Sequence, residues 1–438
     1  MNQSLRRSFV PVAVLLTLAS EGAAQNSESL DQSVSTSGSS FSSVLSSARY
    51  DFGRGLSFTS RDGEATMNIS GQLQAGYSWS DVDARYNPAG DPVGAATLNN
   101  LFGAGDPNGT STSDWSIDQS RLRIGGQVID GLTYFIQFDP QGGDEGNADL
   151  IDAWVGWQFN DAVHVRIGQQ KMRSGLSADT SASDTDFETA SRSLATSEFA
   201  GRRATGVLVT GLGMDGRFHW HAGAMNNGTD SRATSDLLAG ITAGRPQSND
   251  ATDMAFTVGA SFGSGGNSED WSEGDLARVG EPSWITGLTV TQNNAADADY
   301  ETVNVYGGFK SGDGFAAQLE FWSREGDAVP TNLAPAFSAI VPLDYSDTGF
   351  YVQTSYTLKK TGLWQPGFVV RFSSLERGFD DKSGTFSLDD LELTETLIGM
   401  NAYHAAHNLK TQLQIRQISW DDQDLDVTSI DLLFTLVF

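Results

Sequence analysis

The 438-residue chain contains no cysteine and has few positively charged residues. The absence of cysteine excludes disulfides, thiolate metal sites and cysteine nucleophiles. Only 27 Lys and Arg stand against 55 Asp and Glu, which gives a net charge of −28. This acidic balance argues against a nucleic-acid-binding protein, because such proteins need a basic face. Long helices are not favoured either, since the chain has 48 glycines and few runs of strong helix formers.

Aromatic residues are abundant, with 24 Phe, 10 Tyr and 10 Trp. Together with the many Gly, Ser, Thr, Asn and Asp residues, they are typical of short strands joined by turns. A chain of this length has room for two or three ordinary domains or for one large β architecture. The composition therefore favours an all-β protein.

The first residues have the layout of a secretory signal peptide. Two arginines precede an apolar run over residues 9–18, and small residues precede a predicted cleavage after Ala24. The apolar run has about half of the roughly 20 residues that a membrane-spanning helix needs. We expect residues 1–24 to be a signal peptide, residues 25–62 a flexible Ser/Gly-rich segment, and residues 63–438 the folded domain.

Apolar and polar residues alternate repeatedly along the rest of the chain. In residues 132–138, for example, Ile136 and Phe138 flank Gln137, and similar patterns occur in 150–159, 163–170, 216–225, 367–374 and 409–417. The polar face carries charged and amide side chains at mid-strand, which is the pattern of a membrane barrel with lipid outside and a polar lumen. Two stacked sheets in a secreted soluble protein also alternate, so alternation alone leaves that alternative open.

We count about sixteen strands between residues 66 and 438, joined by connections that are alternately short and long. The long segments are 80–114, 172–202, 226–252, 325–346 and 376–392. Short turns at one end and long loops at the other are typical of outer-membrane barrels. One segment departs from this pattern, because 264–283 is long at the end where the turns should be short.

The chain ends on a strand that alternates to its last residue. In "DLLFTLVF" the apolar side chains of Leu432, Phe434, Leu436 and Phe438 share one face. A terminal aromatic on such a strand resembles the C-terminal signal that the bacterial outer-membrane assembly machinery recognises. We therefore predict that Phe438 is an assembly signal.

The central part of the chain resembles the porin O and P family, the phosphate-selective porins of the Gram-negative outer membrane. The matching features are, in order, "SRLRIGG" at 120–126, a hairpin at Asp130–Gly131, "DAWVGW" at 152–157, "IGQQK" at 167–171 and "GRRATGV" at 201–207. The hairpin at 396–417 also resembles the penultimate hairpin of that family. The chain departs from the family where a Pro-Phe is expected after "IGQQK" and "MRSGLSAD" is found instead.

The resemblance implies a sixteen-stranded antiparallel barrel, usually a homotrimer, that passes small hydrophilic anions by diffusion. In porins the third connection at the long-loop end, here 172–202, commonly folds into the lumen as a constriction loop. Arg and Lys in a narrow channel can replace the hydration of an anion. We predict an anion path lined by Arg121, Arg123, Arg166, Lys171, Arg173, Arg192, Arg202, Arg203, Arg217, Arg371, Lys410 and Arg416.

Each of these residues can instead have a purely structural role, since an Arg–Asp or Arg–Glu pair can stabilise a barrel wall. Two further functions also stay open, namely a non-selective or cation-preferring general diffusion porin, and a barrel enzyme or adhesin. The expected partners are small anions, outer-membrane lipids, the assembly machinery and further copies of the chain, with no nucleic acid.

No local motif points to catalysis or to a bound cofactor. His219 and His221 share a strand face but have no third ligand nearby in the sequence. The acidic run at 421–426 lacks the glycine of an EF-hand loop. The chain has no nucleophile elbow, HExxH or Walker loop. We predict no catalytic residue, no metal and no cofactor.

Overall fold

The computed structural model describes residues 45–438, except for 85–110, 141–148, 161, 182–191, 201–202, 227–253, 265–267, 295–297, 329–342, 382–386 and 421–424. The predicted signal peptide, residues 25–44 and Arg202 lie outside the described residues, as does most of the acidic run at 421–426. No helix in the described part is long and apolar enough to cross a membrane.

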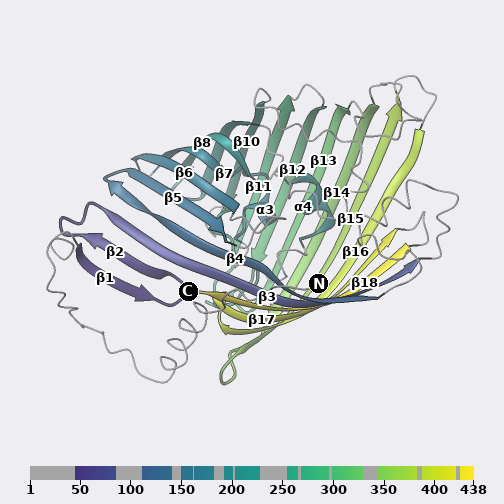
Figure 1. The fold of residues 1–438 in the computed structure, drawn as a ribbon. Coiled ribbons are helices and arrows are strands. Elements are labelled where there is room, and N and C mark those ends of the chain that lie inside the picture. Colours follow the sequence, from purple (N-terminus) through teal and green to yellow (C-terminus); the bar gives the residue numbers. More distant parts are fainter. Residues whose placement is uncertain are drawn as a thin grey trace, which may run out of the picture. The chain divides into compact units, whose positions relative to one another are not determined.

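Sixteen of the described strands, β3 to β18, form one antiparallel sheet that closes on itself because β18 pairs with β3 (Figure 1). The predicted sixteen-stranded barrel is thereby confirmed. The strands are β3 Thr66–Ala84, β4 Thr112–Ile129, β5 Leu132–Asp139, β6 Asp149–Asn160, β7 Val163–Lys171, β8 Arg203–Gly213, β9 Phe218–Asn226, β10 Met254–Gly263, β11 Ser283–Asn294, β12 Ala298–Lys310, β13 Phe315–Ala328, β14 Leu343–Thr357, β15 Gln365–Asp381, β16 Ser387–Ala405, β17 Leu409–Trp420 and β18 Leu425–Val437.

A hairpin precedes the barrel. Strands β1 (Leu45–Asp51) and β2 (Gly55–Ser60) pair with each other, and β2 pairs with the first residues of β3. The prediction of a flexible segment up to residue 62 is therefore wrong for this part. The hairpin is stabilised by β3, whose edge extends past the end of β18 and offers unpaired backbone groups to β2.

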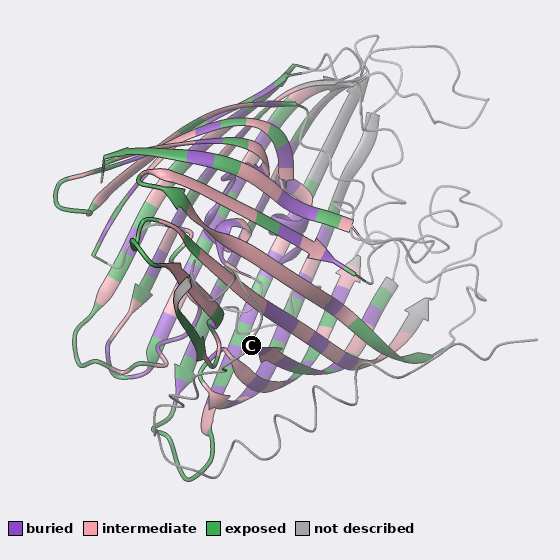
Figure 2. Cartoon of the chain, turned by 60° about the vertical axis from the view of Figure 1, so that its left-hand side comes forward, coloured by how far each residue is buried: buried purple, intermediate pink, exposed green. Residues whose placement is uncertain are grey.

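The strands alternate in exposure as their sequences predict (Figure 2). On β15 the Phe372 side chain is 43% exposed while its neighbour Arg371 is only 3% exposed. On β17 Ile415 is 51% exposed while Gln414 is 3% exposed. Apolar side chains thus cover the outside of the barrel and polar side chains fill its inside, which is the reverse of a soluble protein and suits a bilayer.

The connections fall at two ends of the barrel. A two-residue turn joins β4 to β5, and a four-residue turn joins β12 to β13. Both turns lie at the end of the barrel where β18 finishes. The link from β7 to β8 lies at the opposite end, because consecutive strands are antiparallel. The long connection between β10 and β11 lies at the short-turn end, as the sequence indicated.

Candidate pore constriction

Two short helices lie inside the barrel, in the link between β7 and β8 (Figure 1). These are α3 (Leu176–Asp179) and α4 (Leu194–Phe199). Leu176 is fully buried, as is Ala195 in α4. The prediction that this link folds into the lumen is confirmed for its described parts, residues 172–181 and 192–200, which we call the first constriction segment.

Helix α3 is held at both of its ends by charged side chains. At its start the carboxylate of Glu320 on β13 accepts hydrogen bonds from the backbone N–H groups of Leu176 (3.0 Å) and Ser177 (2.5 Å). At its end the Lys171 ammonium group donates to the carbonyl oxygens of Ala178 (3.1 Å), Asp179 (2.7 Å) and Thr180 (3.2 Å). These charge-assisted bonds complement the two poles of the helix. Lys171, predicted to line the anion path, therefore also positions the segment.

Helix α4 is held by arginine. Arg324 on β13 donates to the carbonyl oxygens of Glu198 (3.2 Å) and Phe199 (3.1 Å) at the end of α4. Its guanidinium group also lies 4.9 Å from the centre of the Phe199 ring. Arg324 was missed by the sequence analysis. Glu320, Trp322 and Arg324 occupy every second position of β13, so the alternation along the strand already placed Arg324 on the inner face.

Arg192 connects the two halves of the first constriction segment. Its guanidinium group donates to the Ser177 side-chain oxygen (3.0 Å) and to the Thr180 carbonyl oxygen (3.1 Å). Ser193 caps α4 by accepting a hydrogen bond from the Thr196 backbone N–H (3.0 Å). Arg192 thus lies in the lumen, as predicted, and ties α3 to the residues that lead into α4.

A second segment enters the lumen from the short-turn end. We call residues 268–278, between β10 and β11, the second constriction segment. The indole of Trp271 is 3% exposed and donates to the Gln318 side-chain oxygen (3.3 Å). Glu273 accepts hydrogen bonds from the side chains of Gln318 (3.0 Å) and Gln353 (2.8 Å). The sequence showed only that this connection was too long for a turn.

The two segments meet at Glu269. Its carboxylate forms ion pairs with Arg173 of the first segment and with Arg166 of the wall, the latter at 3.3 Å. Burial alone would raise the pKa of Glu269, but the positive charges of Arg173 and Arg166 outweigh it and lower the pKa to about 2. Ser268 also donates to the Asp179 carboxylate at 2.7 Å. Glu269 is therefore a charged link between the segments and the wall.

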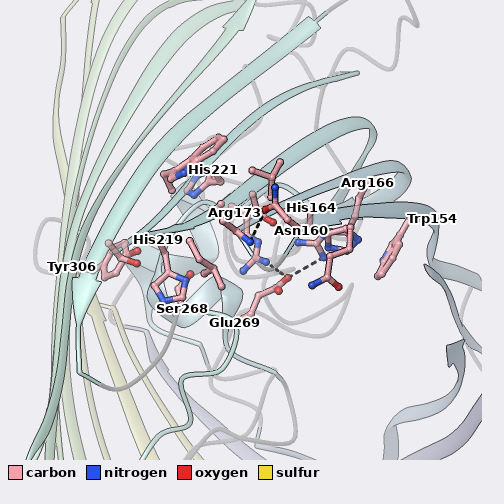
Figure 3. A pocket seen from close by; sticks show the side chains of 18 residues that line it. Trp154, Asn160, His164, Arg166, Arg173, His219, His221, Ser268, Glu269 and Tyr306 are labelled. Carbon is pink, nitrogen blue, oxygen red and sulfur yellow. Dashed lines mark hydrogen bonds and ion pairs between the residues drawn. The ribbon is translucent and has the colours of Figure 1, made fainter. Parts of the chain in front are cut away.

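A cavity of about 380 Å³ opens beside this link (Figure 3). Its lining includes Arg166, Arg173 and Glu269, together with the three histidines at positions 164, 219 and 221. His219 and His221 lie on β9, and His164 lies on β7. No group of three or more potential metal ligands was found among the described residues.

Three predicted path residues are braced by acids of the wall. Arg203 makes two hydrogen bonds to the Asp152 carboxylate (2.9 and 3.2 Å). The Glu395 carboxylate binds Arg371 (2.9 Å) through one oxygen and Arg416 (2.7 Å) through the other. These three arginines share two carboxylates, so their contacts are those of arginines that brace the barrel wall, and the charge of the Arg371–Arg416 pair is only partly compensated.

Arg121 differs from these braced arginines. It is partly exposed on the inner face of β4, and its Nε atom has no hydrogen-bond partner among the described residues. The neighbouring Arg123 donates to the Gln72 side-chain oxygen. Arg203 is close enough for its charge to act on Arg121, and so are the carboxylates of Asp139 and Asp152. The three arginines form what we call the β4–β8 arginine cluster.

One predicted path residue lies elsewhere than expected, and another faces inward but is buried. Arg217 is exposed in the turn before β9, which begins only at Phe218, so its predicted place on the inner wall is wrong. Arg217 belongs to the turn after Gly213, the last residue of β8, and in this turn Met214 and Asp215 both have positive φ angles. Lys410 does face inward but is fully buried, with its ammonium group 3.4 Å from the His407 ring.

Comparisons with known proteins agree with this architecture. The outer membrane channel DcaP of Acinetobacter baumannii has 13% identity and a TM-score of 0.53, covering 87% of this chain and 99% of that chain. OprB of Pseudomonas putida has 11% identity and a TM-score of 0.51, covering 85% and 94%. A loop-deletion variant of OmpT of Vibrio cholerae has 13% identity and a TM-score of 0.49, covering 85% and 99%. At these identities the likeness concerns the fold alone.

Comparison with curated proteins gave no significant match. The sequence profile of the family described as phosphate-selective porin O and P, in contrast, matches residues 100–414. That range includes most of the barrel and both constriction segments. The chain therefore belongs to the phosphate-selective porin O and P family.

Proposed function

We propose that this outer-membrane channel prefers small hydrophilic anions of the phosphate type, which pass it by diffusion. The observation that carries the proposal is Arg121, a lumen-facing arginine without an ion pair among the described residues. The first constriction segment is the narrow place, and the β4–β8 arginine cluster lies on the wall beside it, since Arg203 is paired across the strands with Lys171.

Lys171 adds to this positive field. Its ammonium group binds three carbonyl oxygens, and the carboxylates of Asp179 and Glu269 are close enough to act on its charge. A unit charge about 5 Å from a passing ion, at an effective dielectric near 20, interacts by roughly 3 kcal/mol before salt screening. A few such charges are enough to favour anions over cations in a narrow channel.

The overall acidity of the chain does not oppose this preference. Two acidic residues of the inner wall form ion pairs with arginine, namely Asp152 with Arg203 and Glu395 with two arginines. An exposed acid is screened within a Debye length of about 8 Å at physiological salt. Local charge at the constriction therefore matters more than the net charge of −28.

The test is a measurement of reversal potential in planar bilayers under a salt gradient. The Arg121→Gln variant should lower the ratio of anion to cation permeability severalfold. The control is Arg217→Gln, which removes the same charge from an exposed turn and should leave the ratio unchanged. If the unmodified channel strongly prefers cations, the anion proposal is wrong and the general diffusion alternative takes its place.

We further propose that the barrel assembles as a homotrimer in contact with outer-membrane lipids, as the family resemblance implies. The apolar outer face supports contact with lipid or with another subunit, since side chains such as Ile167 (61% exposed) and Phe159 (64% exposed) project from it. Crosslinking in native membranes, read on gels after mild and full denaturation, tests the trimer.

A further inference from the structure

We infer that residues 268–278 act as a second constriction element and that Glu269 is the residue that positions it against the first. The inference rests on the proposed channel function and adds to it the element that sets the width of the channel. The first constriction segment enters the lumen from the end of β7, and the second enters from the end of β10. These are opposite ends, because β7 to β10 are joined in antiparallel register.

The second constriction segment contacts the wall from β12 to the turn between β16 and β17. The Trp271 ring lies over Gly308 of β12, where an added Cβ would come within 2.5 Å of it. The Lys310 ammonium group lies 4.6 Å from the centre of that ring. Further along, Asp275 accepts from the Gly314 backbone N–H (2.7 Å), and Arg278 donates to the Thr357 carbonyl oxygen. These contacts show that the segment packs against the inner wall of the barrel and is not simply a long turn outside it.

The Glu273 carbonyl oxygen makes a further contact with the fully buried ring of His407, at 3.0 Å. His407 lies in the short turn between β16 and β17. Burial holds the pKa of His407 well below its usual range, so the ring stays neutral and can donate a hydrogen bond to the carbonyl oxygen. The segment is thus held from β12 through to the turn after β16.

The link to the first segment depends on one carboxylate. Glu269 forms ion pairs with both Arg166 of the wall and Arg173 of the first segment. Arg173 has a further carboxylate at 3.8 Å, that of Asp179, which already accepts the Ser268 hydroxyl group. Without Glu269, two buried guanidinium groups would face each other with less compensation, and their repulsion would separate the segments.

An apolar contact reinforces the link. Leu176 of α3 packs in one buried cluster with Trp271, Ile285 and Tyr306. The two segments therefore share a core as well as an ion pair. The two segments reach the wall at Arg166 of β7 and at Gln318 and Glu320 of β13, so displacing either segment should widen the lumen.

The first experiment records single channels of the Glu269→Gln variant. Since loss of the link frees one of two constricting elements, we expect conductance to rise roughly twofold and the preference for anions to fall. The control is Glu281→Gln, which makes the same change at an exposed residue of the same connection and should behave as the unmodified protein. A folded Glu269→Gln channel with unchanged conductance and selectivity would overturn the inference.

The second experiment uses the absence of native cysteine. In a Ser268→Cys/Asp179→Cys variant the sulfur at position 268 replaces the hydroxyl oxygen, and the sulfur at position 179 replaces the Cγ atom, one bond back from the carboxylate oxygen that lies 2.7 Å from that hydroxyl group. We expect a disulfide to form, detected by a change in gel mobility, and conductance to be lower in the oxidised than in the reduced form. Failure of the disulfide to form in the folded barrel would contradict the proximity of the two segments and overturn the inference.

The gel readout separates this inference from the proposed function. If the unmodified protein forms no channel, the proposed function fails, while disulfide formation still tests whether the segments meet. If the unmodified protein conducts and the disulfide forms, equal conductance in the oxidised and reduced forms overturns the role of the second constriction segment in setting channel width.

Discussion

The aromatic ring of Phe438 lies over Gly71 of β3, and the two residues exchange both backbone hydrogen bonds, at 2.6 and 2.9 Å. A Cβ atom on residue 71 would come within 2.6 Å of the ring, so glycine is needed for this contact. The last residue of the chain thus completes the seam between β18 and β3. It lies beside the place where β2 joins the same edge of β3.

Deletion of Phe438 should leave exported protein that assembles poorly. The deletion removes the proposed recognition element for the assembly machinery and also the last pair of seam hydrogen bonds. Heat-modifiable mobility of the outer-membrane fraction measures the yield of folded barrel. The control is Phe434→Ala, which removes an outward aromatic from the same face of β18 but keeps the terminal residue. Normal yield of the deletion variant would refute this role.

A charge on the outer face should destabilise the barrel. Phe372→Lys places an ammonium group where the side chain is 43% exposed to lipid, and we expect a cost of about 2–4 kcal/mol near the bilayer midplane. Phe372→Leu is the matched apolar control. Urea unfolding in lipid vesicles, followed by tryptophan fluorescence, measures the difference. Equal stability of the two variants would mean that this face does not meet lipid.

Inward-facing positions of the barrel do not all tolerate a charged substitution. From the pattern alone, Ser373→Lys should be mild, because Ser373 faces the lumen. The structure corrects this, since Ser373 is fully buried and its oxygen accepts from the Ala195 backbone N–H (3.4 Å) below α4. Gln137, another inner position, is only 4% exposed. We expect Ser373→Lys to displace α4, which would be measured as increased conductance of a barrel that still folds.

Glu320→Leu should loosen the first constriction segment. The change removes the acceptor of the hydrogen bonds from Leu176, Ser177 and the Tyr351 hydroxyl group (2.8 Å). Each bond to a charged group contributes on the order of 1.5–3 kcal/mol. We expect noisier and larger single-channel currents while barrel yield stays normal. Glu325→Gln, at an exposed position of the same strand, should have no such effect.

Asp152→Asn should strengthen the preference for anions. The carboxylate of Asp152 neutralises Arg203, and its removal would leave the arginine charge free to act on passing ions. A change of one charge near the constriction corresponds to roughly 3 kcal/mol before screening. The permeability ratio of anions to cations, measured as for Arg121→Gln, should move in the opposite direction. A fall in the ratio would mean that Arg203 does not act on the ion path.

The Glu269 link should persist in mildly acidic medium. Its pKa is lowered to about 2 from a value of 4.5 in the unfolded chain. Ionised Glu269 therefore contributes its full stabilisation above about pH 4.5, and the contribution disappears as the pH falls through about 2. The groups facing it include Arg166, Arg173 and Lys171, which stay positive in this range, and Asp179, whose pKa is raised by burial.

We expect no Glu269-dependent rise in conductance between pH 7 and pH 5. The comparison of unmodified protein with Glu269→Gln at each pH isolates this effect from the titration of other groups. If the two proteins converge in conductance already near pH 5, Glu269 is not held by its arginines in the way the geometry indicates.

The sequence by itself determined the barrel. Side chains of a strand alternate between its two faces, so the order Phe372, Arg371, Val370 already assigned each residue to lipid or lumen. Alternating connection lengths indicated the two ends of the barrel, and the excess length of 264–283 marked that connection as unusual. The inward placement of Arg166 and Arg371 followed from the same local rule, and so did that of Lys410.

Only the tertiary structure decided what the inward charges do. Arg166 and Glu269 are 103 residues apart in the chain, and no local pattern relates a strand to a distant connection. Arg203 forms an ion pair with Asp152, while the Nε atom of Arg121 has no hydrogen-bond partner among the described residues, although both arginines follow the same alternation along their strands. The physical reason is that an electrostatic field depends on distances in space. Periodicity in a sequence sets only the direction in which each side chain leaves the backbone.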